Sequence, residues 1–139
     1  MKDLKTFVEQ YMDAIPRRDF GMMRQMLHSQ YSFTGSDGHR QEGADAGIAV
    51  TEMYINAFPD MTLEIKHMNV AGDTVVTEFT AHGTHKGELM GIEPTNRRVA
   101  IPVCNITEFR DAKIIAEREY FDAVFMMQQL GVEVGHAHA

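Results

Sequence analysis

The first part of the chain repeats its apolar residues with the period of an α-helix. Between residues 4 and 15 they recur at spacings of three and four, which places them on one face of a helix that Pro16 helps to end. Asp19 is well placed to cap a second short helix, because its side chain can accept free backbone N–H groups. A third helix is expected from about residue 45 to 58, where Pro59 stops it.

From residue 61 the apolar period changes to two. Apolar and polar residues alternate in "MTLEI", which is typical of a half-buried strand. Three more strand-like runs follow, "TVVTEFTAH", "RRVAIPVCNITEF" and "KIIAEREYF", and "RDAK" reads as the hairpin turn between the last two. Helices first and antiparallel strands afterwards form an α+β pattern. We expect the helices to pack on one face of a strongly curved sheet that forms a cone with a cavity at its mouth.

Length and composition predict one soluble domain spanning residues 1–139. The 139 residues are 44% hydrophobic and 24% charged, and no apolar run approaches the roughly 20 residues of a membrane span. The charged start "MKDLKTFVEQ" lacks the features of a signal peptide, so we expect a cytoplasmic location. The tail from about residue 132 is expected to be flexible.

Charge and spacing argue against nucleic-acid and metal partners. The net charge is −7 and the basic residues are scattered, whereas phosphate-backbone binding needs a basic patch. His136 and His138 alternate in the expected flexible tail, which makes them poor metal ligands. We therefore expect no metal site.

Four segments of the second half together resemble one family. They are "AFPDMTLEI" (57–65), "AGDTVV" (71–76), "AHGTHKGELMGIEPTNRRVAIP" (81–102) and "KIIAEREYFDAVFMMQQLG" (113–131). They are similar to the SnoaL-like polyketide cyclases, within the nuclear transport factor 2-like superfamily. The resemblance implies a cystatin-like roll, usually dimeric, with a pocket between the concave sheet and the N-terminal helices. It also implies cofactor-free chemistry, an intramolecular aldol reaction that closes a ring on an aromatic polyketide ester.

The resemblance assigns the acid/base role to Asp122, which matches an aspartate on the last strand of the cyclases. Strand alternation places Arg118, Tyr120 and Asp122 on one face, which we expect to be the polar face of the pocket. The alternative is that Asp122 caps a helix starting at Ala123. Both uses stay open, because Asp122 lies between a strand and a helix.

Other residues are candidates for substrate binding. His85 has an imidazole that can donate to a substrate carbonyl, or it can stabilise its loop as a rim histidine. Met90 and Ile92 belong to a loop that covers the cavity mouth or packs against the helices. Tyr54 and Phe58 line the pocket or belong to the core.

The leading hypothesis is therefore acid/base catalysis without a cofactor on a small apolar or aromatic carbonyl compound. The alternatives are a non-catalytic domain that binds a small molecule, and a related isomerase or epoxide hydrolase of the same fold. A homodimer is implied by the resemblance. A sheet face carrying Val99, Ile101, Val103 and Phe121 is the expected partner surface.

Overall fold

A computed structural model describes residues 3–133 of the chain. The predicted helices are present, and His136 and His138 lie outside the described residues. The elements are α1 (Leu4–Ala14), α2 (Phe20–Met26), β1 (Leu27–Thr34), β2 (Arg40–Glu42), α3 (Ala44–Ala57), β3 (Thr62–Ala71), β4 (Thr74–Thr84), β5 (Arg98–Arg110), β6 (Lys113–Phe121) and α4 (Ala123–Gln129).

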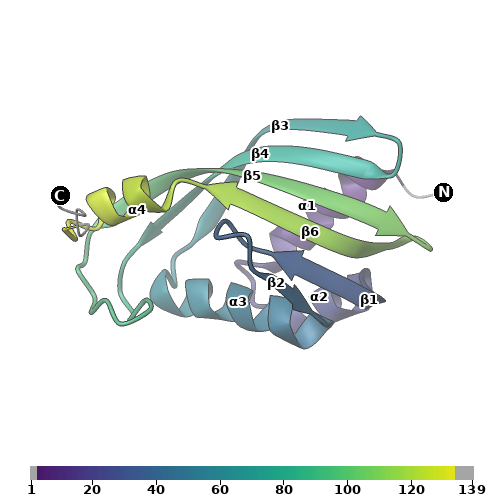
Figure 1. Ribbon diagram of the computed structural model, residues 1–139. Coiled ribbons are helices and arrows are strands. Elements are labelled where there is room, and N and C mark those ends of the chain that lie inside the picture. Colours follow the sequence, from purple (N-terminus) through teal and green to yellow (C-terminus); the bar gives the residue numbers. More distant parts are fainter. Residues whose placement is uncertain (1–2, 134–139) are drawn as a thin grey trace.

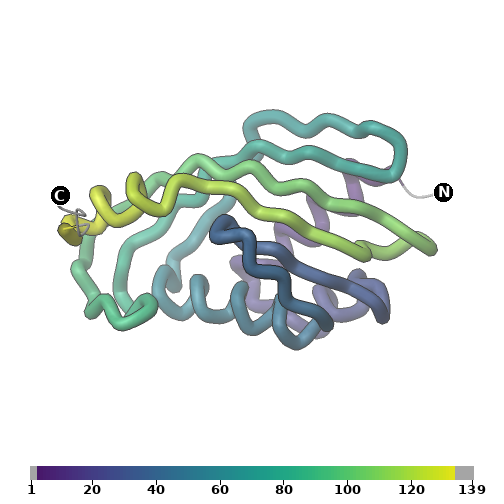
Figure 2. Tube along the Cα trace, in the orientation of Figure 1, coloured from purple at the N-terminus to yellow at the C-terminus, as the bar shows by residue number. Residues whose placement is uncertain are grey.

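The strands form one curved six-stranded sheet in the order β2-β1-β6-β5-β4-β3. All neighbouring pairs are antiparallel except β1 and β6, which are parallel. Figures 1 and 2 show helices α1, α2 and α3 together on one side of the long strands. Helix α1 packs against β3 and β4, and α3 packs against β1 and β2. The predicted α+β class with helices on one face of a curved sheet is thus confirmed.

Local sequence signals set the helix ends. The side chain of Asp19 accepts a hydrogen bond of 3.1 Å from the backbone N–H of Met22, as expected for the cap of α2. At the C-terminal end, residues beyond α4 still contact the core. Val132 donates a backbone hydrogen bond of 3.0 Å to Met127 and packs against the core, and the flexible tail expected from about 132 lies mostly outside the described residues. Within residues 3–133, no helix is both long and apolar enough to cross a membrane.

The β5–β6 hairpin decides which residues face the helices. Its loop has two residues, Asp111 and Ala112, both with positive φ, which is the pattern of a type I′ turn. A three-residue loop would have paired Cys104 with Arg118. The two-residue loop is followed by a bulge at residue 115, after which Cys104 pairs with Tyr120. Beyond the bulge, even-numbered residues of both strands therefore share one face, and odd-numbered residues share the other.

The odd-numbered face is the inner one. Val99, Ile101 and Val103 are buried there, and Phe121 lies beside them. These four residues were expected to form a partner surface, and this expectation is wrong, because the helices cover the concave side of the sheet. The even-numbered residues of β5, and those of β6 beyond the bulge, face outwards, whereas Ile114, before the bulge, pairs with Phe109 and is buried.

Candidate active site

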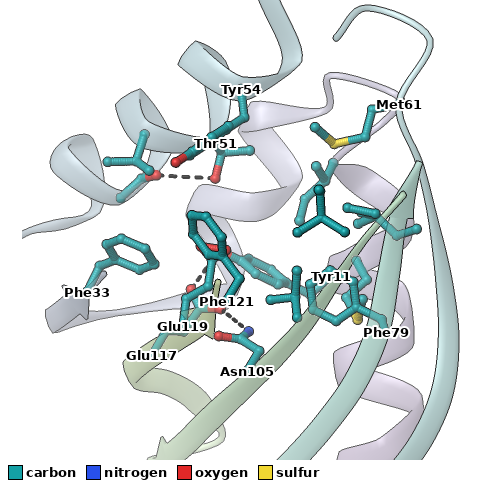
Figure 3. A pocket seen from close by; sticks show the side chains of 18 of the residues that line it. Tyr11, Phe33, Thr51, Tyr54, Met61, Phe79, Asn105, Glu117, Glu119 and Phe121 are labelled. Carbon is teal, nitrogen blue, oxygen red and sulfur yellow. Dashed lines mark hydrogen bonds between the residues drawn. The ribbon is translucent and has the colours of Figure 1, made fainter. Parts of the chain in front are cut away.

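A cavity of about 140 Å³ lies between the concave face of the sheet and helices α1 and α3 (Figure 3). Its lining is mainly aliphatic, aromatic and methionine side chains, with a few polar groups. The lining residues are Val8, Tyr11, Met12, Ile15, Tyr31, Phe33, Gly47, Val50, Thr51, Tyr54, Phe58, Met61, Leu63, Phe79, Ala81, His82, Val99, Ile101, Val103, Asn105, Thr107, Glu117, Glu119, Phe121 and Met126. Such a site suits an apolar ligand that is oriented by a few polar contacts.

Glu117 is a buried carboxylate whose two oxygens are held by neutral donors. The hydroxyls of Tyr11 and Tyr31 donate to Oε1 at 3.1 and 2.5 Å, and Asn105 Nδ2 donates to Oε2 at 3.1 Å. Burial raises the pKa of Glu117, while the three hydrogen bonds act in the opposite direction. The donors come from α1, β1 and β5, so the network fixes Glu117 against three elements at once.

Glu119 lies two residues further along β6, on the same face as Glu117 (Figure 3). Within the described part of the chain, its carboxylate has neither a hydrogen-bond nor an ion-pair partner. Burial, and secondly the negative charge of Glu117, raise the pKa of Glu119 to about 7. A carboxyl group of this kind is available to exchange a proton with a ligand near neutral pH.

Helix α3 contributes Tyr54 on the opposite side of the pocket from the sheet. The Tyr54 ring meets Phe121 edge-on, with ring centroids 6.5 Å apart. Burial, with smaller contributions from Glu119 and Asp37, raises the pKa of Tyr54 to about 12, so its hydroxyl keeps its proton near neutral pH. A neutral phenol in this place can donate a hydrogen bond to a ligand oxygen.

Asp122 is the N-cap of α4. Its Oδ1 accepts a hydrogen bond of 3.0 Å from the backbone N–H of Phe125, and the residue is exposed. Asp122 is not part of the pocket lining. Of the two uses considered, the helix cap is the one that the structure places here, because the strand ends at Phe121 and α4 begins at Ala123.

Arg118 and Tyr120 were expected to face the pocket, and this expectation is wrong. They lie on the even-numbered face of β6, where Arg118 pairs with Glu108 and Tyr120 is 47% exposed. The odd-numbered face, which had been expected to serve a surface or a partner, carries Glu117 and Glu119 instead. The alternation of β6 did not single out the two glutamates, because this strand has polar residues on both faces.

His85 is buried outside the pocket lining, in the loop that follows β4. Its Nδ1 lies 3.2 Å from the backbone N–H of Thr95, and its ring packs against Phe58 with centroids 5.5 Å apart. This arrangement fits the loop-stabilising alternative, since Nδ1 bonds Thr95 within the loop and the ring lies outside the cavity lining. Its Nε2 has no partner among the described residues.

The remaining candidates divide between the pocket and the covering loop. Tyr54 and Phe58 line the pocket. Met90 is 58% exposed, and Ile92 packs partly buried against the core through a bridge with Leu89. Neither Met90 nor Ile92 lines the cavity, so of the two alternatives for this loop, packing against the core describes Ile92 and covering the cavity mouth describes neither residue.

The curved α+β cone and its internal pocket define a nuclear transport factor 2-like protein. The chain belongs to the SnoaL-like polyketide cyclase family, whose model matches residues 5–130. A search among curated proteins found no match.

Solved structures share the fold over nearly the whole chain. A SnoaL-like polyketide cyclase candidate from Jannaschia sp. CCS1 is 20% identical, with 93% of this chain and 92% of that chain covered and a TM-score of 0.85. IdmH, a proposed polyketide cyclase from Streptomyces antibioticus, is 25% identical over 94% of this chain and 100% of its own, with a TM-score of 0.83. An epoxide hydrolase from M. tuberculosis is 22% identical, over 90% and 86%, with a TM-score of 0.71. The similarity to the Jannaschia protein and to the epoxide hydrolase shows a shared fold and nothing more.

Proposed function

We propose that this protein is an acid/base enzyme that acts on a small apolar carbonyl compound without a cofactor, by aldol-type cyclisation. The observation that carries the proposal is the carboxyl group of Glu119, which lies unpartnered in an apolar pocket with a pKa of about 7. Family membership supports the reaction class. A homodimeric state and a cytoplasmic location stay predictions.

Glu119 is the proposed catalytic residue. In the ionised form it removes a proton from a carbon beside the carbonyl, and the resulting enolate attacks a second carbonyl of the same molecule. The protonated Glu119 then returns the proton to the new alkoxide, so that no proton is gained or lost. A base with a pKa near the working pH combines a sufficient ionised fraction with sufficient basicity. In this proposal Tyr54, which lines the pocket and keeps its proton, donates a hydrogen bond to the oxygen on which negative charge develops.

The first half-reaction can be tested with a model ketone. β-Tetralone has an acidic C–H beside its carbonyl, and its exchange for deuterium in D₂O is followed by NMR. We expect the protein to accelerate this exchange, with a rate that rises with pH through about 7 and then levels off as Glu119 becomes fully ionised. Glu119→Gln should reduce the protein-dependent rate by roughly 10²-fold or more, the usual contribution of a positioned base.

Asp122→Asn is the matched comparison for that experiment. Asparagine is also a good N-cap, so this variant removes the carboxylate while keeping α4 capped. We expect Asp122→Asn to exchange β-tetralone at nearly the wild-type rate. A large loss in Asp122→Asn with an unaffected Glu119→Gln would transfer the acid/base role to Asp122, as the family resemblance implies.

A further inference from the structure

The pocket has an uneven distribution of charge. Among residues 3–133, its lining includes two carboxylates, Glu117 and Glu119, and no lysine or arginine. Of the described lining residues, His82 alone can become cationic, and its Nε2 already lies 2.9 Å from Glu64 Oε1. A carboxylate-bearing ligand would therefore meet two negative groups and no positive one.

The two carboxylates differ in what they need from a ligand. Glu117 already accepts three hydrogen bonds, whereas Glu119 accepts none from the described residues. An ionised carboxylate in an apolar site is costly until a cation or hydrogen-bond donor reaches it. Glu119 thus has no such partner among residues 3–133, and a ligand could supply one.

We propose that the pocket binds a hydrophobic organic cation, in which an aromatic ring fills the cavity and an ammonium group pairs with Glu119. The ring surfaces beside Glu119 favour such a ligand, because Tyr54 and Phe121 meet edge-on and line the same pocket (Figure 3). Aromatic faces attract ammonium groups. The cavity of about 140 Å³ is close to the volume that accommodates one benzene ring.

The groups around Glu119 make binding depend on pH in a defined direction. Glu117 lies on the same strand, Tyr11 on α1, Tyr31 on β1 and Tyr54 on α3. All three tyrosines have raised pKa values and stay neutral, and the imidazole of His82, on β4, is engaged with Glu64. Glu119, beside the hydrogen-bonded Glu117, is therefore the carboxyl group whose charge changes near pH 7 and bears on an ammonium ligand. An alkylammonium ion keeps its charge over this range. Affinity for the cation should therefore rise as pH increases through about 7.

Three small molecules of similar shape test the proposal by isothermal titration calorimetry. Phenethylamine carries a positive charge, phenethyl alcohol none and phenylacetate a negative one. At about pH 8 we expect phenethylamine to bind roughly tenfold or more tightly than the alcohol, and phenylacetate to show no binding. In Glu119→Gln the amine should lose this advantage and bind like the alcohol.

Glu52→Gln is the matched control, since Glu52 is exposed on α3 outside the pocket lining and the change in net charge is the same. It should leave all three affinities unchanged. A measurement on the wild-type protein avoids substitutions altogether. At about pH 6, titrations in buffers of different ionisation heat should show proton release on amine binding, because the ammonium favours ionised Glu119.

Equal affinity for the amine and the alcohol, binding of phenylacetate, or absence of proton release would each overturn the proposal. So would a failure of all three compounds to bind. The inference goes beyond the proposed reaction and does not depend on it, because binding is measured at equilibrium without turnover. Exchange of β-tetralone can therefore fail while amine binding succeeds, or the reverse.

Discussion

At the scale of single residues, two causes raise the pKa of Glu119, and a substitution can separate them. Burial is the larger cause and the negative charge of Glu117 is the second. Glu117→Gln removes only the charge, and the tyrosine hydroxyls and the amide of Asn105 can reorient to bond the new side chain. We expect the pKa of Glu119, followed by NMR titration of its carboxyl carbon, to fall below about 7 but to stay above 4.5.

The same titration in Glu52→Gln gives the control, because that exposed residue lies outside the pocket lining. Glu52→Gln should change the pKa of Glu119 very little. An unchanged pKa in Glu117→Gln would show that burial alone sets the value.

Which side chains of β6 face the pocket was the feature least predictable from the sequence. Alternation along β6 correctly separated Glu119 from Asp122, but it did not say which face is inside, because both faces carry charged residues. The apolar residues Val99, Ile101 and Val103 of β5 mark the inner face. Transferring that information to β6 requires the register of the hairpin, and both the turn length and the bulge change the register by one residue.

At the scale of elements, the contact between α3 and β1 depends on a glycine. A Cβ atom at Gly47 would lie 2.6 Å from Cε2 of the buried Tyr31 ring. Gly47→Ala should push Tyr31 away from Glu117 and lower the free energy of unfolding by about 1–3 kcal/mol, the usual cost of overpacking. Urea denaturation measures this change.

Gly21→Ala provides the comparison within another helix, α2. There a Cβ atom would meet its nearest neighbour, Asp19 Oδ1, at 3.9 Å, which is ordinary contact. This variant should be as stable as the wild type or more stable by up to about 1 kcal/mol, owing to the helix propensity of alanine. Equal stability of Gly47→Ala and Gly21→Ala would contradict the close packing of α3 on β1.

Elements were predictable where their signals are local. Helix α2 follows a cap at Asp19, and α3 ends just before Pro59, so both could be located from the sequence. Strand β2 (Arg40–Glu42) could not, because three polar residues carry no pattern and it forms only by pairing with β1. The same limit applies to the parallel pairing of β1 with β6, which joins segments far apart in the chain.

At the scale of the whole molecule, the pocket is a product of long-range packing. Tyr11 and Tyr31 reach Glu117 across 106 and 86 positions of the sequence. The fold class followed from the order of helices and strands, and the resemblance added the position of the cavity. The different environments of Glu117 and Glu119 could not be predicted from the sequence. The donors to Glu117 come from α1, β1 and β5, and their positions relative to the two glutamates are set only by the packing of these elements.

The buried carboxyl groups should also make the stability of the whole protein depend on pH. The folded-state pKa of Glu119 is about 7 and its ordinary value is 4.5, so between these values the folded protein binds a proton that the unfolded chain has released. Stability therefore decreases as pH rises through this window and levels off above about 7, at a cost of at most about 3 kcal/mol. Glu117 adds to this trend, because its pKa is also raised.

Glu119→Gln removes one of these titrations. Relative to the wild type, its free energy of unfolding should increase progressively between about pH 5 and pH 8, because the variant no longer has to bury that ionised carboxylate. Urea denaturation of both proteins across this range measures the difference, and the contribution of Glu117 largely cancels. Glu52→Gln should show a constant difference from the wild type, since it changes an exposed group. A constant difference for Glu119→Gln as well would mean that Glu119 titrates at the same pH in the folded and unfolded chains, and the pocket would then hold an ordinary carboxylate.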